Sequence, residues 1–215
     1  MFRIIFGAVA LLALPMTGPM TGPMTGAAAF EATELAKLKA GGACPRCDLS
    51  GADLKGMDLS GRDLQGADLS SAQLQGADLT RANLRSVNLE KAELAEANLR
   101  KAILDGARLT GARLSGASFY KAQAPVAPPN FAGADLEGAQ FYKAAFGAAD
   151  FRGARVQGAS FYKADLKGAD LREADLSGTS FMAADLTGAD FNGATLESTL
   201  FWRAVLDDTK GLEFR

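Results

Sequence analysis

Large apolar residues recur every five positions over most of the chain. Leu or Phe occupies this position from Leu49 to Phe119 and again from Phe131 to Leu206, with Val156 as the one substitute. The residue two positions earlier is mostly Ala, and the other three positions are mostly Asp, Asn, Ser, Gly, Lys or Arg. A period of five fits neither the roughly 3.6 residues per turn of a helix nor the two-residue alternation of a flat strand. The pattern therefore predicts one short extended piece and one corner in each unit.

The apolar residue that repeats is taken as the centre of its unit, and thirty-one such units are counted. Because side chains alternate in an extended chain, the centre and the residue two before it are expected to point inward. Gly is frequent two positions after the centre, where we expect a corner with positive φ. Asp is frequent directly before the centre, where its carboxylate is expected to accept backbone N–H groups of the corner.

A second period sets the number of sides. Segments that begin FYKA, FMAA or FWRA recur with steps of 22, 20, 20 and 20 residues. Twenty residues make four units, so four sides per coil are predicted. The longer step contains the proline-rich segment 123–130, which we interpret as a two-residue insertion that forms a rigid, looped-out corner. The five-residue register resumes afterwards, which indicates one domain.

The tandem A-(D/N)-L-x-x units over residues 47–206 resemble those of the pentapeptide-repeat family. The resemblance implies an all-β fold, a right-handed quadrilateral parallel β-helix. Four units per coil give about eight coils, and strand spacing of about 4.8 Å makes a rod about 37 Å long. The best-known branch of the family suggests one function, an acidic rod that mimics duplex DNA and protects type II topoisomerases such as gyrase.

Both ends of such a rod are exposed strand edges and need covers. Residues 30–40, followed by two glycines, are expected to form a short amphipathic helix over the first coil, so residues 30–46 are assigned as an N-terminal cap. Arg62 and Met57 replace the inward Ala near this end, where an open coil is expected to tolerate them. The tail 207–215, with Leu212 and Phe214, is expected to close the other end or to form a homodimer with a second copy.

Residues 1–29 have the features of a signal peptide. Arg3 precedes an apolar core at residues 4–14, and the run Ala27–Ala29 offers a cleavage site. That core is too short for a bilayer, which requires about 20 residues. We therefore expect a periplasmic or secreted protein without a transmembrane span after cleavage, and a retained anchor is the alternative.

Cys44 and Cys47 form a C-x-x-C motif just before the counted repeats, and Cys47 takes an inward position. Secreted members of the family similarly often carry a cysteine pair there. A structural disulfide is the favoured interpretation in an oxidising compartment. Buried free thiols, redox chemistry or a metal shared between chains are the alternatives.

The composition argues against catalysis. The chain has no histidine, which removes the usual general base near neutral pH and the commonest metal ligand. The repeated Asp residues are explained by corners, and no nucleophile and base can be paired. We expect no enzyme, no cofactor and no metal site, and the formal net charge of −2 selects no partner by itself.

One outer side combines aromatic and basic residues. They are expected either to stack merely as surface packing or to form a platform for a protein partner, an anionic surface or an acidic glycan. Nucleic acid is disfavoured as a partner, and so is DNA mimicry, because of the signal peptide and the weak net charge. The predicted function is thus a binding scaffold of the cell envelope or exterior, with a purely mechanical filler as a further alternative. The candidate residues of this face are Tyr120, Lys121, Tyr142, Lys143, Tyr162, Lys163, Met182, Trp202 and Arg203.

Overall fold

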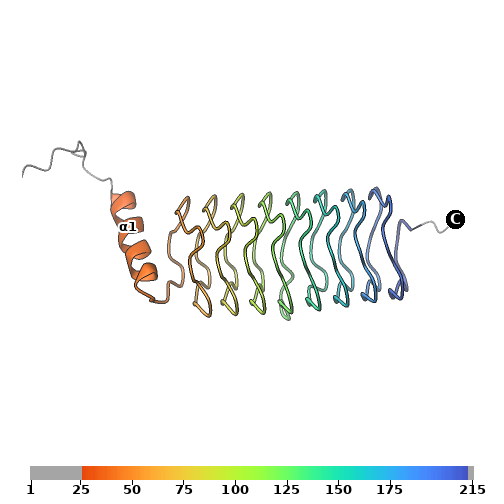
Figure 1. Cartoon of the computed structure of the whole chain (residues 1–215), viewed down its shortest axis with the longest axis horizontal. Helices are drawn as coiled ribbons and strands as arrows, with labels where there is room; N and C mark the ends of the chain where they lie inside the picture. The colour runs from red at the N-terminus through yellow and green to blue at the C-terminus, as the bar shows by residue number, and fades with distance from the viewer. Residues whose placement is uncertain (1–25, 213–215) are drawn as a thin grey trace, which may run out of the picture.

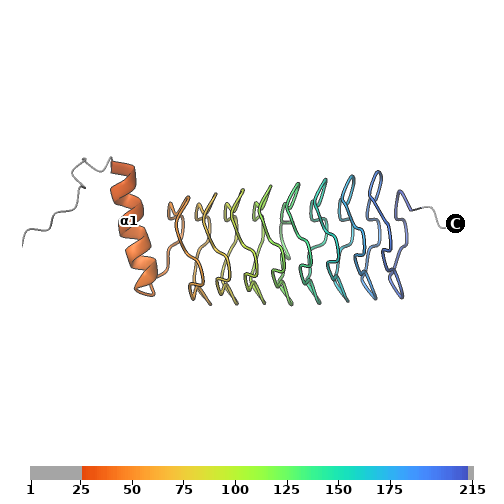
Figure 2. The ribbon, with the colours of Figure 1, turned by 45° about the horizontal axis from the view of Figure 1, so that its top comes forward.

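The computed structural model describes residues 26–212, with the side chains of the helix described from Thr33 onward. The chain forms a rod of stacked four-sided coils with one helix, α1 (Gly26–Lys39), at its N-terminal end (Figures 1 and 2). This is the predicted right-handed quadrilateral β-helix. Residues 1–25 of the predicted signal peptide, and Phe214 of the tail, lie outside the described residues. No helix within 26–212 is long and apolar enough to cross a membrane.

The sides of the rod are built from single-residue parallel bridges. Asp48 pairs with Asp68, and Asp68 pairs with Asn88, so each bridge joins residues one coil apart. Across the proline-rich segment the step lengthens, and Arg108 pairs with Asn130. Four bridges per coil therefore replace the longer strands of an ordinary sheet.

Each unit satisfies its backbone N–H groups in the same way. The N–H groups of Leu49 and Gly51 donate to the next coil at 2.7 and 2.9 Å, and the N–H of Ala52 closes the corner onto the oxygen of Leu49 at 3.0 Å. The remaining corner N–H, of Ser50, donates to the carboxylate of Asp48 at 3.1 Å. The same carboxylate bond recurs in many units, which confirms the predicted role of the Asp before the centre.

The bore of the rod is filled by the predicted centres and inward alanines, which are buried except near the two ends. Leu fills the N-terminal half. In the C-terminal half, the rings of Phe119 and Phe141 stack at 4.6 Å, and Phe161 stacks on Phe141 and Phe181 at 4.4 and 5.0 Å. Thr179 replaces an inward Ala, and its hydroxyl donates to a carbonyl of the preceding coil at 2.7 Å, so the buried oxygen is satisfied.

The repeat is longer than predicted at two places. Cys44 is a centre, because it is fully buried and its N–H donates to Asp63 one coil later, as other centres do. Ala124 is also a centre, because its N–H donates to Ala145 and Gln123 beside it continues the bridges of its side. Both were missed because neither residue is large and apolar.

The insertion lies between Ala124 and Ala127. In other coils the oxygen of the first residue after the centre accepts an N–H from the corner of the preceding coil. Here the oxygen of Ala127 takes this place and accepts the N–H of Gly106. Below it the buried carboxylate of Asp105 accepts the N–H groups of Val126 and Ala127 and pairs with Arg85 at 3.1 Å. The two additional residues thus lie in this corner, and a buried carboxylate accepts its backbone N–H groups.

The N-terminal cap is anchored by polar contacts as well as by apolar packing. Leu38 of α1 is buried against the core, and the carboxylate of Glu34 accepts the N–H of Asp48 at 2.6 Å. The guanidinium of Arg62 donates to the oxygen of Gly41, where the helix ends. Arg62 is thus part of the cap rather than a residue tolerated at an open end. The helix also begins at Gly26, earlier than the predicted start at Phe30.

The C-terminal end is less covered. Leu200, Trp202 and Val205 of the last coil are 52%, 59% and 42% exposed, and Leu212 of the tail packs only partly against the core. In the part of the chain that the structure describes, the N–H groups of Phe201 and its neighbouring centres in this coil have no backbone acceptor. This end keeps an apolar surface and a free strand edge.

Candidate binding face

The third side of each coil carries the predicted aromatic and basic residues, and we call it the basic face. Two columns of side chains run along it, at the first and second corner positions after the centres. The bridges and corner bonds place them in register from coil to coil. The first column is Ser60, Thr80, Arg100, Tyr120, Tyr142, Tyr162, Met182 and Trp202; the second is Gly61, Arg81, Lys101, Lys121, Lys143, Lys163, Ala183 and Arg203.

The three tyrosines stack on one another along the rod. The rings of Tyr120 and Tyr142 are 5.2 Å apart with 14° between their planes, and those of Tyr142 and Tyr162 are 5.5 Å apart with 29°. Met182 and Trp202 continue the column, but the indole makes no ring contact with the tyrosines among the described residues. The predicted stack is therefore confirmed for three of its five members.

Cations pack against these rings. The guanidinium of Arg100 lies 4.4 Å from the ring centre of Tyr120, and the ammonium groups of Lys121, Lys143 and Lys163 lie 5.1–5.3 Å from the ring of the preceding tyrosine. Arg203 lies in the same way 4.4 Å from Trp202. Each such contact stabilises an exposed cation by about 0.5–1 kcal/mol.

This arrangement corrects the predicted use of the tyrosines. A platform that binds by stacking needs free ring faces, but Tyr120 lies between Arg100 and Tyr142, and Tyr142 lies between two tyrosines. The tyrosine rings are half-buried, and their edges and hydroxyl groups rather than their faces are directed to the surface. Around Tyr120 and Tyr142 the basic face therefore offers positive charge and hydrogen-bond donors rather than stacking surfaces.

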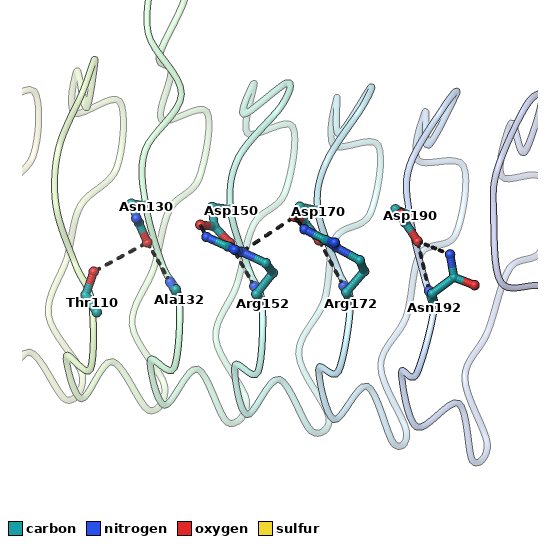
Figure 3. A network of polar contacts seen from close by, with 9 residues as sticks. All are labelled: Thr110, Asn130, Ala132, Asp150, Arg152, Asp170, Arg172, Asp190 and Asn192. Atoms are coloured by element: carbon teal, nitrogen blue, oxygen red, sulfur yellow. Dashed lines mark hydrogen bonds and ion pairs between the residues drawn. The ribbon is translucent and has the colours of Figure 1, made fainter.

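The cations of the basic face form no ion pairs within residues 26–212. The nine ion pairs of the rod all lie on its other sides. On the opposite side, for example, Arg152 binds Asp150 at 2.6 Å and approaches Asp170, which binds Arg172 at 2.6 Å (Figure 3). These arginines lower the pKa of both carboxyl groups through hydrogen bonds. The basic face has seven basic residues against Asp58 and Asp78, so its charge is not neutralised.

The second column adopts an unfavourable backbone conformation for its side chains. The corner after each centre has positive φ, and the side of the rod that begins with Asp53 places Gly there in six of its eight coils. On the basic face only Gly61 does so, while Lys121, Lys143 and Lys163 have φ of 53–58°. A left-handed conformation costs a non-Gly residue about 1–2 kcal/mol. The basic face thus has cations at corners whose backbone conformation favours glycine. Strained backbone of this kind is typical of functional positions.

The two cysteines lie away from the basic face, at the first corner beside the cap. Cys44 and Cys47 are paired, with their Cα atoms 5.4 Å apart. Both are buried, in line with a structural role. The oxidised state in purified protein remains a prediction. No cluster of metal-ligating side chains is found within residues 26–212.

Comparisons with known proteins support the fold. A family model described as pentapeptide repeats matches residues 47–85, 92–123, 130–168 and 164–203 in eight copies. Two trypsin-treated variants of QnrB1, described as a plasmid-mediated fluoroquinolone resistance protein, are 22% and 24% identical. The matches cover 73% and 76% of this chain and 83% and 86% of theirs, with TM-scores of 0.62 and 0.59. At these identities the likeness shows the fold alone.

A further solved structure is HetL from the cyanobacterium Nostoc, described as a pentapeptide repeat protein involved in heterocyst differentiation regulation. It is 27% identical, and the match covers 83% of this chain and 93% of HetL with a TM-score of 0.34. No match was found among curated protein sequences.

Proposed function

Because the chain belongs to the pentapeptide-repeat family, we propose that this protein is a non-enzymatic binding scaffold. Its basic face binds an anionic partner. The scaffold works in the cell envelope or outside the cell, a location that rests on the signal-peptide features of residues 1–29.

The observation that carries this proposal is the unpaired charge of the basic face. Elsewhere on the rod, arginines such as Arg113 and Arg155 are held by carboxylates at 2.7–3.3 Å. On the basic face, seven cations are left for a partner in a chain whose net charge is negative. Cations in a row on one face raise the local potential and attract anions.

The packing interpretation accounts for less. Rings stacked in register stabilise neighbouring coils, and lysines beside them keep an aromatic surface soluble. Solubility alone, however, does not require lysine at a corner that prefers glycine, since lysine at the neighbouring exposed positions would serve as well. The strain at Lys121, Lys143 and Lys163 supports a role for charge at this particular place.

DNA mimicry is the alternative function, and the charge distribution speaks against it. The most acidic side of the rod, which begins with Asp53, has seven acidic residues against three basic ones. Duplex DNA carries one charge per ~1.7 Å, or roughly 20 over the length of this rod. The basic face, moreover, would repel the positively charged surface of a DNA-binding enzyme.

The C-terminal end offers a second surface, for a protein partner. Leu200, Trp202 and Val205 gather around the free edge of the last coil. A second copy that pairs its own last coil with this edge would bury these side chains and satisfy the edge N–H groups. A homodimer through this end is compatible with the proposed function, because it leaves the cations from Arg81 to Lys163 exposed on both copies.

The test of the proposed function compares the wild-type protein with a variant in which Tyr142, Lys143, Tyr162 and Lys163 are all changed to Ser. Serine already occupies the left-handed corner at Ser71 and elsewhere, so the variant is expected to fold. Both proteins are incubated with anionic vesicles, acidic glycans and envelope extract. The variant is expected to lose the partners that the wild type retains, and rising salt should weaken the wild-type interaction. Equal retention of all partners would leave a mechanical role.

A further inference from the structure

The basic face presents its charges as a straight row with the spacing of one coil. From Arg81 to Lys163 the second column carries a cation in five successive coils. Coils stack at about 4.8 Å, and the tyrosine rings beside the row are 5.2 and 5.5 Å apart. A ligand that matches this row must carry anionic groups at a similar repeat along a line.

A second, uncharged row lies on the other side of the tyrosine column from the cations, because its residues come directly before the centres and the cations come two positions after them. The positions just before the centres of the basic face hold hydroxyl and amide side chains from the third coil to the seventh. These groups both donate and accept hydrogen bonds, as the hydroxyl groups of a sugar do. The row consists of Asn98, Ser118, Gln140, Ser160 and Ser180.

The surroundings of the two rows favour a narrow ligand over a flat one. The corner that precedes the basic face carries Glu96, Glu137 and Glu197. A broad anionic surface, such as a lipid headgroup layer, would meet these carboxylates together with the lysines. A single extended chain that follows the row avoids them.

The tyrosines help to distinguish between two kinds of polyanion. Single-stranded nucleic acid binds largely by stacking its bases on free aromatic faces, but the faces of Tyr120 and Tyr142 are occupied. In duplex DNA the phosphates of one strand are about 3.4 Å apart along the axis, which does not match the coil spacing. The phenol hydroxyl groups, in contrast, donate well to carboxylate or sulfate oxygens.

We infer that the basic face binds a linear acidic polysaccharide with one anionic group per sugar, extended parallel to the rod. This inference rests on the proposed function and specifies its ligand. Each anionic group lies against one cationic corner between Arg81 and Lys163, a tyrosine hydroxyl or the corner lysine donates to it, and the sugar hydroxyl groups lie along the neutral row.

The experiment measures the affinity of the exported protein for polygalacturonate oligomers of one to ten sugars. Affinity should rise steeply with length, because linked sites bind cooperatively, and should level off near five sugars, the number of consecutive cationic corners. Hyaluronan, with a carboxylate on every second sugar, should bind more weakly at equal length, and neutral dextran should not bind. Length-independent affinity, or equal affinity for hyaluronan, would overturn the inference.

Variants locate the site. Changing Lys121, Lys143 and Lys163 together to Ser should weaken binding of the polygalacturonate octamer at least about tenfold, or about 1.4 kcal/mol. Lys91→Ser is the matched control, because Lys91 has the same left-handed corner conformation on another side of the rod, and it should bind as the wild type does. Circular dichroism and thermal unfolding confirm that both variants are folded. An effect of the control as large as that of the triple variant would overturn the inference.

Two further probes separate this inference from the proposed function. Vesicles that contain phosphatidylglycerol and a duplex DNA are tested at the same salt concentration. If the triple variant loses vesicles or DNA while no protein binds the oligomers, the polysaccharide inference is wrong and the proposed function stands. If the wild type binds none of these polyanions, both are wrong.

Discussion

Replacing a lysine of the basic face by glycine separates a functional role from a structural one. Lys143 has a φ of 55°, and its ammonium lies 5.2 Å from the ring of Tyr142. Lys143→Gly relieves a left-handed conformation that costs about 1–2 kcal/mol. It also adds about 0.5–1 kcal/mol of glycine entropy and removes a cation–π contact of about 0.5–1 kcal/mol. The free energy of unfolding is therefore expected to change by less than about 1 kcal/mol in either direction.

The control is Lys91→Gly, on the side of the rod opposite the basic face. Lys91 has a φ of 57° and no ring contact among the described residues, so only the first two effects apply. This variant should be between as stable as the wild type and about 1.5 kcal/mol more stable. The difference between the two variants then measures the cation–π contact alone.

Thermal unfolding followed by circular dichroism is a suitable assay, because about 1 kcal/mol shifts Tm by about 2–4 °C in a domain of this size. We expect Lys143→Gly to unfold within about 4 °C of the wild type and Lys91→Gly at the wild-type Tm or up to about 6 °C above it. Only Lys143→Gly should bind anionic partners more weakly. A fall in Tm of more than about 6 °C for Lys143→Gly would refute the reasoning, since it would show that the lysine is retained for packing.

Three other predictions concern the rod and its ends. Phe161→Ala removes a buried ring stacked on both sides at 4.4 and 5.0 Å and should cost ~3–5 kcal/mol, measurable as a fall in Tm; a fall below 2 °C would contradict the stacked core. Deletion of residues 125–126 restores the five-residue register but moves Pro128 into a corner that requires positive φ. The deletion alone should therefore lower the free energy of unfolding by about 3 kcal/mol or more. Adding Pro128→Gly to the deletion should restore most of the stability. Equal stability of the deletion variant with and without Pro128→Gly would refute this register. Finally, exported protein should begin at Phe30, and a longer product would reject the signal peptide. After alkylation without reductant, mass spectrometry should find neither cysteine modified, and two alkylated thiols would reject the disulfide.

Much of the fold follows from the sequence because each unit repeats the same local solution. Leu or Phe at the centre, Ala two before it and Asp beside it each meet one requirement of a narrow, cornered coil. The rule misses Cys44 and Ala124, since a small centre is recognised only by its hydrogen bonds to the next coil. The anchoring of Arg62 to Gly41 is also invisible in the repeat, because the partner lies in the cap.

The location of the candidate face was predictable, but its chemistry was not. A period of four units places Tyr120, Tyr142 and Tyr162 in one column, and the structure confirms it. Whether the rings lie flat on the surface or stack edge outward depends on side-chain torsions that a one-dimensional pattern does not contain. Nor does the pattern show which cations are paired, since partners such as Arg155 and Asp135 lie one coil apart.

The most direct test of the central claim is lysine labelling of the exported protein with and without a bound polyanion. Polygalacturonate and phosphatidylglycerol vesicles are used in separate runs, and acetylation at each exposed lysine is read by mass spectrometry. We expect Lys121, Lys143 and Lys163 to be protected by a polyanion that binds, while Lys55 and Lys91 on the other sides stay labelled. Protection spread evenly over all five lysines, or confined to Lys55 and Lys91, would contradict the claim that the basic face is the binding site.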